Sequence, residues 1–250
     1  MKCLLCWMAA LLLLPSFSFA DPLPLAEDLS ETVTVFYNGE DETGGSYRYS
    51  YTYPYADPED PTAYLVNTYY EYLVKDTLDY RIPNLSDYYS GIHLDVSVEI
   101  SYEVTCNNEE YFSVLIHKME NVDGEVSETW NGDTFSRKNG MPGSVCSLPN
   151  ILGILDAGES DEWLENRQAR KIQEIVRNLV WELILENRDG IDYDPGFPEE
   201  DLELVFDPEM DFWLDETGNP VFFILPGRIA PEEAGLLTYS VSLETIRDEI

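Results

Sequence analysis

The chain is poor in the residues from which most recognisable catalytic and metal sites are built. Its 250 residues include 2 His and 4 Cys. Neither His93 nor His117 has the spacing to a Cys that a zinc site requires. Patterns for a nucleophile elbow, a metal-binding His pair, a phosphate loop or a dinucleotide turn are also missing. We therefore predict no catalytic, cofactor-binding or metal-binding residue, and we expect a protein that is not an enzyme.

Basic residues are scarce as well. The chain has 14 Lys and Arg against 49 Asp and Glu, which gives a formal charge of −35. A negative field of this size repels nucleic acid and anionic membrane surfaces, so both are excluded as partners. The same field favours a cationic partner or a divalent metal ion. The alternative interpretation is that the charge only keeps an exported protein soluble.

Long apolar runs are missing beyond the N-terminus. Residues 1–20 contain one basic residue, Lys2, then a short apolar core, then small residues at Ser18 and Ala20. This is the pattern of a secretory signal peptide that is cut after Ala20. The alternative, a membrane anchor, would need about 20 apolar residues. We expect an exported protein, periplasmic or extracellular and not inserted in the membrane, whose charge becomes −36 when Lys2, the one charged residue of the peptide, is removed.

The cysteine count suits this compartment. Cys3 and Cys6 would leave with the signal peptide, so Cys106 and Cys146 would remain as an even pair. Disulfides persist in oxidising compartments. We therefore predict a disulfide between Cys106 and Cys146. The alternative is a pair of buried free thiols.

The segment 189–201 is rich in carboxylates, which are the ligands that Ca²⁺ prefers. Its acidic residues are Asp189, Asp192, Asp194, Glu199, Glu200 and Asp201. The positions of its Gly and Glu do not match an EF-hand. A solvated loop is the simpler interpretation.

The first half of the mature chain alternates in the manner of strands around one helix. Residues 21–30 are expected to form a flexible leader. Helical spacing of apolar residues predicts a helix from Pro61 to Asp79, which begins after an N-cap at Asp60. Strands are predicted over 32–37, 46–53, 94–100 and 111–118, followed by two more within 119–139 that turn at 122–124 and at 131–132.

The second half is organised around a long helix and an aromatic hairpin. The long helix is expected to begin after Ser160 and to end at Gly190, with an apolar stripe along one face. Two aromatic runs around a turn rich in Asp, Gly and Asn predict a β-hairpin over 211–225. Further elements are predicted as a short helix over 148–155, a strand over 202–206, a loop over 226–235 and a strand over 237–243. The expected fold class is α+β, with each half laying one helix on an antiparallel sheet.

The C-terminal segment also carries a resemblance to a known family. Ile229-Ala230-Pro231, followed by Ala234-Gly235, lies between the aromatic hairpin and the last strand. This pattern resembles the C-terminal signature of a secreted domain of unknown function that forms the ectodomain of RsiV-type anti-sigma factors and occurs in PdaC-type deacetylases. Tyr53-Pro54 and Asn67 resemble the module that precedes it in those proteins. The family's Gly-Gly-Ala-His-Gly run is replaced here by Asn121-Val122-Asp123-Gly124, so a function tied to that His is not carried over.

The resemblance implies both a domain division and a function. It divides the chain into an N-terminal PdaC-like module, residues 31–105, and a C-terminal RsiV-like domain, residues 106–250. RsiV-type ectodomains bind lysozyme. The resemblance therefore implies an exported, non-catalytic binding protein of the cell envelope that recognises a cationic protein such as lysozyme, or cell-wall glycan. The alternative is an envelope glycan hydrolase, or another hydrolase, whose carboxylate site the sequence does not reveal.

Overall fold

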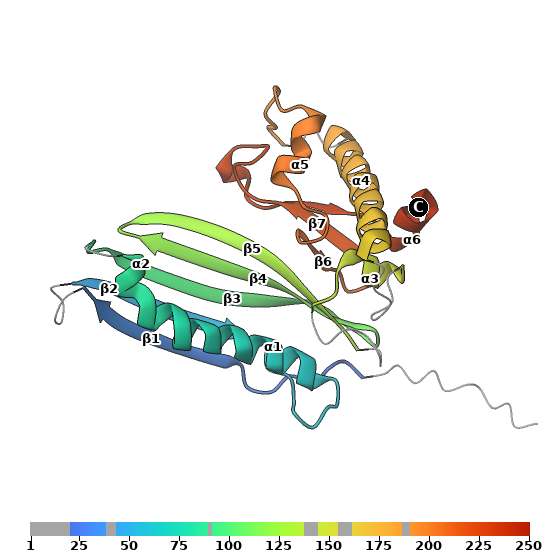
Figure 1. Ribbon diagram of the computed structural model, residues 1–250. Coiled ribbons are helices and arrows are strands. Elements are labelled where there is room, and N and C mark those ends of the chain that lie inside the picture. Colours follow the sequence, from blue (N-terminus) through green and yellow to red (C-terminus); the bar gives the residue numbers. More distant parts are fainter. Residues whose placement is uncertain (1–20, 39–43, 90–91, 138–144, 155–161, 187–190) are drawn as a thin grey trace, which may run out of the picture.

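The computed structural model describes residues 21–38, 44–89, 92–137, 145–154, 162–186 and 191–250. Its fold is α+β, with two sheets that are each covered by a helix (Figure 1). The larger sheet has five strands in the order β1-β2-β3-β4-β5, and the smaller has three in the order β6-β7-β8. The predicted fold class is therefore confirmed. Within the described ranges, no helix is both long and apolar enough to cross a membrane.

The larger sheet is mixed and not wholly antiparallel. Its strands are β1 (Leu29–Tyr37), β2 (Gly45–Tyr53), β3 (Asp95–Asn107), β4 (Tyr111–Val122) and β5 (Glu125–Ser136). Most neighbours are antiparallel, but β2 and β3 run parallel, with Tyr47 opposite Val96. The expectation of antiparallel pairing is wrong at this junction. The chain between the two strands crosses the sheet as helix α1 (Ala63–Asp76), so β3 enters in the same direction as β2.

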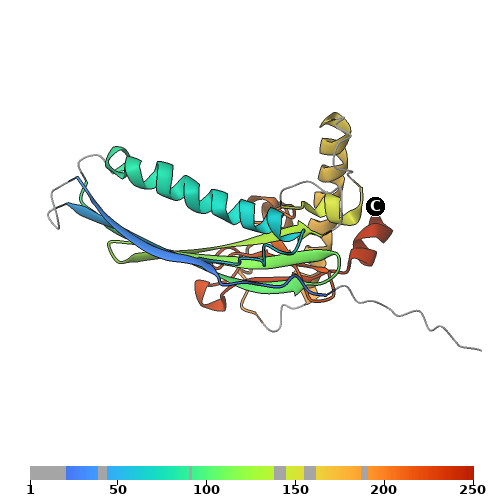
Figure 2. The ribbon, with the colours of Figure 1, turned by 90° about the horizontal axis from the view of Figure 1, so that it is seen from below.

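Helix α1 covers one face of the larger sheet (Figure 2), and the tyrosines of β2 pack against the helix on that face. The alternation predicted for β2 is observed, because the side chains at every second position are buried: Tyr47, Tyr49, Tyr51 and Tyr53. The ring of Tyr53 stacks on that of Tyr70 from α1, with 4.9 Å between ring centroids. The helix continues as a π-helical turn, η2 (Thr77–Arg81), and then as η3 (Ile82–Asn84) and α2 (Leu85–Tyr88).

The smaller sheet consists of β6 (Phe212–Leu214), β7 (Pro220–Ile224) and β8 (Leu237–Ser240), and it is covered by α4 (Glu162–Glu186). The predicted hairpin and the predicted short helix, α3 (Leu148–Leu152), are both present. The apolar stripe of α4 is also confirmed, because its central residues are at most 2% exposed: Ile172, Val176, Val180 and Ile184. The predicted cap at Ser160 and end at Gly190 lie outside the described residues.

Two short helices replace predicted strand residues in the second half. Residues 202–206 were expected to form a strand, but they follow η4 (Glu199–Asp201) as helix α5 (Leu202–Val205). Leu202 and Phe206 are buried whereas Leu204 is 75% exposed, so burial follows the period of a helix and not that of a strand. At the C-terminus, α6 (Leu243–Glu249) begins where the last strand was expected to end, with Ser242 as its N-cap.

The two sheets share one boundary. The side of the larger sheet that faces away from α1, called here the back face, carries Ser113 and Thr134, which are fully buried. Their hydroxyl oxygens lie 2.8 Å apart, and the backbone N–H of Leu214 in β6 donates to Ser113 Oγ at 3.0 Å. The division expected at 105/106 falls inside β3, and β4 and β5 belong to the same sheet as β1–β3.

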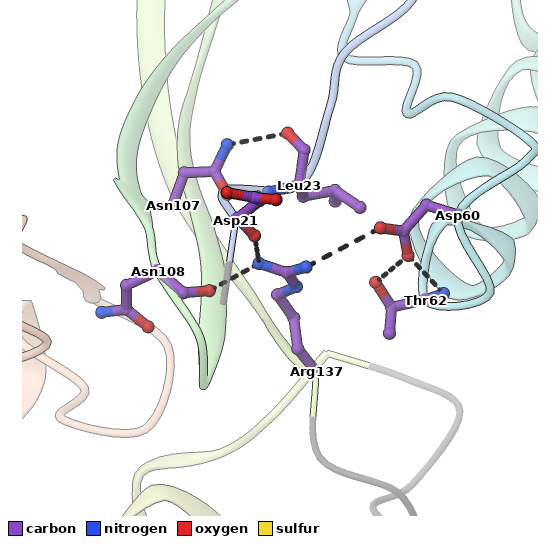
Figure 3. A network of polar contacts seen from close by, with 7 residues as sticks. All are labelled: Asp21, Leu23, Asp60, Thr62, Asn107, Asn108 and Arg137. Atoms are coloured by element: carbon purple, nitrogen blue, oxygen red, sulfur yellow. Dashed lines mark hydrogen bonds and ion pairs between the residues drawn. The ribbon is translucent and has the colours of Figure 1, made fainter. Parts of the chain in front are cut away.

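The leader, expected to be flexible, is held against the larger sheet. Leu23 is 2% exposed, and its backbone forms two hydrogen bonds with the side chain of Asn107, at 2.7 and 2.9 Å. Arg137, just after β5, donates through Nη1 to the carbonyl oxygens of Asp21 and Asn108 at 2.9 and 2.8 Å (Figure 3). Its Nη2 lies 3.8 Å from a carboxylate oxygen of Asp60. One guanidinium therefore joins the leader, the β3–β4 turn and the loop before α1.

Candidate functional site

The β4–β5 hairpin extends beyond the smaller sheet, and its free part bears the candidate site (Figure 1). Alternate residues of β5 face the back of the sheet. In the inner half of β5, Gly132 lies against β6 and Thr134 is buried, whereas Val126, Glu128 and Trp130, in the outer half, are not fully covered. The exposed part of this strand thus presents an aromatic ring and a carboxylate on one face.

Trp130 is held in place by a cross-strand pair. It lies opposite His117 of β4, and the two rings stack with 4.7 Å between centroids and 17° between planes. His117 Nε2 also lies 3.2 Å from a carboxylate oxygen of Glu128. Cross-strand contacts of this kind restrict side-chain rotation, so the indole is ordered before any ligand arrives. His117 was predicted to have no metal-binding role, and its partners here are an indole and a carboxylate.

The other wall of the site is the loop that crosses from β7 to β8. Two prolines and two glycines shape this loop, and Gly227 and Gly235 both adopt positive φ, as a loop without regular structure requires. A single helical turn, η5 (Glu232–Ala234), brings Glu232 toward β5. The residues that carry the family resemblance therefore belong to the loop that faces Trp130.

Between β5 and this loop is a groove of about 430 Å³, called here the Trp130 groove. Its lining consists of Val126, Glu128, Trp130, Pro226, Glu232, Gly235 and Leu236. This volume lies within the range of about 300–1,000 Å³ that is typical of ligand sites. An aromatic ring beside two carboxylates is an arrangement that attracts a cation, through the ring quadrupole and through charge.

A second polar cluster lies under α1, in the core of the larger sheet. Burial raises the pKa of Asp133 to about 6, although three donors partly offset this effect. Tyr70 donates to Asp133 at 3.0 Å, Asn131 at 2.6 Å and Tyr69 at 3.5 Å. A perturbed carboxyl can mark an active site. Asp133 is only 2% exposed and is enclosed by the rings of α1, so we assign it to the core.

The predicted disulfide is not formed in the structure. Cys106 and Cys146 are both free and buried. Cys106 pairs with Ser113 of β4, Ser113 pairs with Thr134 of β5, and the backbone N–H of Cys146 donates to the carbonyl of Thr134. Two strands therefore separate the cysteines. Neighbouring strands lie about 4.8 Å apart, whereas a disulfide spans at most about 7 Å between Cα atoms.

The acidic segment 189–201 lies partly outside the described residues. Among residues that the structure describes, no group of three or more His, Cys, Asp or Glu side chains could hold a metal ion. Asp194 and Glu200 are exposed to solvent. The Oδ1 atom of Asp194 accepts a hydrogen bond from the backbone N–H of Gly196 at 2.9 Å. This contact is typical of an Asp that stabilises a turn.

Sequence reasoning did not identify the Trp130 groove. Trp130 and Glu232 are far apart in the chain, and nothing in their local patterns links them. The sequence does carry a weaker indication of the groove. Val126, Glu128 and Trp130 occupy alternate positions in the outer part of β5 and so share one face. A Trp on a strand face that also carries carboxylates is unusual if that face only contacts solvent.

Comparison with known proteins gives a structural similarity only. No family model matches the chain, and no curated protein matches it. Two similar solved structures are a member of the DUF3298 family from Bacteroides fragilis and a DUF3298 family protein from Pseudomonas aeruginosa. Each is 13% identical to this chain with a TM-score of 0.48, and each alignment covers 91% of this chain and 94% of the other. Neither is named for a ligand or an activity, and neither is named as an RsiV-type protein.

Proposed function

We propose that the protein is an exported, non-catalytic binding module of the cell envelope that recognises a cationic protein at the Trp130 groove. The observation that carries the proposal is the arrangement of the Trp130 ring beside Glu128 and Glu232 in a groove of about 430 Å³. Lysozyme is the cationic protein that the resemblance to RsiV-type ectodomains suggests.

The groove has the chemistry to bind a Lys or Arg side chain. The cation would lie over the indole of Trp130, and its N–H groups would donate to the carboxylates of Glu128 and Glu232. A cation over an aromatic face contributes roughly 0.5–2 kcal/mol, depending on how fully it is desolvated. The apolar stem of the same side chain would contact Val126 and Leu236, which also line the groove.

The charge of the whole molecule supports the same partner. A chain with 49 acidic and 14 basic residues accelerates the approach of a basic protein over distances longer than any single contact. Specific recognition still requires a local anchor, because charge alone raises the association rate more than it raises the final affinity. The Trp130 groove supplies such an anchor.

The test compares two double variants with the same change in net charge. Glu128→Gln/Glu232→Gln removes the groove carboxylates, whereas Glu125→Gln/Glu233→Gln removes two neighbouring exposed carboxylates that do not line the groove. Lysozyme is the probe, and its affinity for the mature chain is measured at fixed ionic strength. We expect the groove variant to bind at least about tenfold more weakly than the control variant.

Two outcomes would overturn the proposal. Equal weakening by both double variants would reduce the interaction to general charge attraction. A lack of lysozyme binding at low salt would exclude lysozyme as the partner. A pull-down of envelope material would then test whether cell-wall glycan is the ligand.

The hydrolase alternative requires an acid and a base that face one cleft. The carboxyl groups whose pKa is raised to about 6 are Asp133, in the core under α1, and Asp211, which accepts a hydrogen bond from the backbone of Asp207. Neither lines the Trp130 groove. This arrangement favours binding over acid–base catalysis there, and release of reducing ends from cell-wall glycan would contradict the proposal.

A further inference from the structure

A smaller pocket lies on the opposite face of the larger sheet, between its strands and the end of α1. Its volume is about 200 Å³, and we call it the tyrosine pocket. Its lining consists of Tyr47, Tyr49 and Tyr53 from β2, Leu73, Asp76, Thr77 and Arg81 from α1 and η2, Val98 and Ile100 from β3, and Lys118 from β4. Lys118 and His117 are adjacent on one strand and so face opposite sides, which separates this pocket from the Trp130 groove.

The π-helical turn η2 determines which residue reaches the mouth of the pocket. A π turn inserts one extra residue into a helix and so rotates everything after it, and such turns are frequent at functional sites. Arg81 closes this turn. Its charge acts on the hydroxyls of both Tyr47 and Tyr49. Arg81 forms no ion pair with any residue that the structure describes, whereas Lys118 is paired with Glu120 at 2.7 Å.

The hydroxyl groups of the pocket are neutral donors and acceptors. Burial raises the pKa of Tyr47 to about 12 and also raises the pKa of Tyr49, so both keep their protons at neutral pH. The hydroxyl of Tyr49 is hydrogen-bonded to those of Tyr53 and Thr77. Thr77 Oγ1 donates its own proton to the carbonyl of Leu73 at 3.1 Å, so it accepts the proton of Tyr49. The Tyr49 proton is thus used within the protein. Within the described part of the chain, we find no hydrogen-bond partner for the hydroxyl of Tyr47, and that hydroxyl is therefore available to a ligand.

The apolar part of the lining is small and lies on the strands and on α1. Val98 is 3% exposed, and Ile100 and Leu73 are partly buried beside it. A ligand in this pocket therefore meets a short aliphatic surface, several hydroxyl groups, one carboxylate at Asp76 and one unpaired guanidinium at Arg81. The pocket volume is below the range of about 300–1,000 Å³ that is typical of drug-sized ligands, so the ligand is small.

We infer that the tyrosine pocket binds a sugar acid the size of one monosaccharide, with its carboxylate on Arg81. The C–H groups of the ring would pack against Leu73, Val98 and Ile100. Its hydroxyls would bind the tyrosines and Asp76. A guanidinium binds a carboxylate through two parallel N–H···O bonds, which fixes the orientation of the ring.

A multiply charged anion fits the pocket less well than a carboxylate. Asp76 lines the pocket, and Glu120 occupies Lys118 at its mouth. The Lys118–Glu120 pair is neutral, so a phosphate dianion would meet the negative charge of Asp76 and only one unpaired cation, Arg81. A neutral sugar would leave Arg81 without a partner. The charge balance therefore selects a single carboxylate.

The experiment measures binding of glucuronate to the mature chain by calorimetry, with glucose as the probe that has the same ring without the carboxylate. We expect saturable glucuronate binding, and at least about tenfold weaker binding of glucose. The variant Arg81→Gln should lose at least about tenfold in affinity for glucuronate. The matched control is Arg48→Gln, because Arg48 is exposed on β2 but faces the back of the sheet.

Three results would overturn the inference. They are no saturable binding of glucuronate up to roughly 20 mM, equal affinity for glucose, and unchanged affinity in Arg81→Gln. Tyr47→Phe gives a second readout inside the pocket, since it removes one hydroxyl and keeps the ring in the core. We expect it to weaken glucuronate binding severalfold while the melting temperature without ligand shows that the variant is folded. This site is independent of the Trp130 groove, so lysozyme binding should be unaffected by either substitution.

Discussion

A Cβ atom added to Gly132 would lie 1.7 Å from the carbonyl oxygen of Phe212. The backbones of β5 and β6 are therefore in direct contact where the two sheets meet. The pair Asn131-Gly132 predicts a turn, but β5 passes straight through it, from Glu125 to Ser136. The absent side chain permits close approach of another backbone and does not end the strand.

The first prediction follows from this contact. Gly132→Ala should lower the free energy of unfolding by roughly 3 kcal/mol or more, because a carbonyl in a strand cannot move away as a flexible side chain could. Chemical denaturation measures this change. Gly196→Ala is the control, since a Cβ there would meet only the Asp194 side chain, at 3.4 Å. Equal stability of the two variants would contradict the close contact.

The second prediction concerns Asn67, which is 7% exposed. Its side chain accepts from the N–H of Ala56 and donates to the carbonyl of Ala56, both at 2.8 Å. Asn67→Ala leaves both backbone groups buried without partners and should cost about 2–4 kcal/mol of stability. Asn67→Asp should be no better, because a carboxylate oxygen would face the Ala56 carbonyl. Thr68→Ala, an exposed change on the same helix, should stay within about 0.5 kcal/mol of the wild type.

The third prediction is a pH dependence of stability. Burial raises the pKa of Asp133 to about 6, above its ordinary value of 3.8. Between these values the folded state binds more protons than the unfolded state, so the contribution of Asp133 to the free energy of unfolding falls as the pH rises. Lowering the pH from 7 to 5 should therefore stabilise the wild type by about 1 kcal/mol more than it stabilises Asp133→Asn.

The control for this experiment is Asp87→Asn, which removes the same charge from an exposed position. Asp211, whose pKa is also raised to about 6, is unchanged in both variants, so its contribution cancels. If Asp133→Asn and Asp87→Asn show the same dependence on pH, the raised pKa of Asp133 is refuted.

The fourth prediction concerns the thiols. Burial raises the pKa of Cys106 to about 11 and also raises the pKa of Cys146, so the reactive thiolate is scarce at both sites. We expect no alkylation of the folded protein at pH 8 and two alkylated cysteines after unfolding without reductant. Intact-mass spectrometry of the mature chain checks both statements. An intact mass that increases when reductant is added would instead support the predicted disulfide.

The fifth prediction concerns lysozyme, if it binds as proposed. Association should slow steeply with ionic strength, because the screening length falls from roughly 10 Å at 0.1 M to about 3 Å at 1 M. Some affinity should remain at high salt through Trp130, which does not depend on charge alone. Stopped-flow and equilibrium measurements over a salt series separate the two effects. Complete loss of binding at about 0.3 M salt would show that the Trp130 groove does not contribute to the affinity for lysozyme.

Much of the architecture follows from periodicity in the sequence. The helical spacing of Val66, Tyr70 and Val74 predicts α1, and the four alternating tyrosines predict β2. The predicted hairpin over 211–225 is present because its turn residues suit a tight reversal: Asp215 accepts hydrogen bonds from Thr217 and Asn219. These features are local, and local patterns encode them.

Features that depend on distant pairing were not predictable in the same way. The parallel alignment of β2 and β3 leaves no mark on either strand, because alternation is the same in both directions. Leu202 to Phe206 is too short for its apolar spacing to distinguish a strand from a helix. The even cysteine count indicated a disulfide, but pairing depends on which strands come between the cysteines. The Trp130 groove exists only once the β7–β8 loop lies beside β5.

The position of β4 has a consequence for how the molecule melts. Phe112, Val114 and Ile116 belong to the core under α1, whereas Tyr111, on the other side of the strand, belongs to the core under α4. Strand β4 thus contributes side chains to both hydrophobic cores, and neither core can form without it. In differential scanning calorimetry we expect a single cooperative unfolding transition, for which the calorimetric and van't Hoff enthalpies agree. Amide protons of β4 should exchange only through that global opening, and those of β1, at the free edge of the sheet, should exchange sooner.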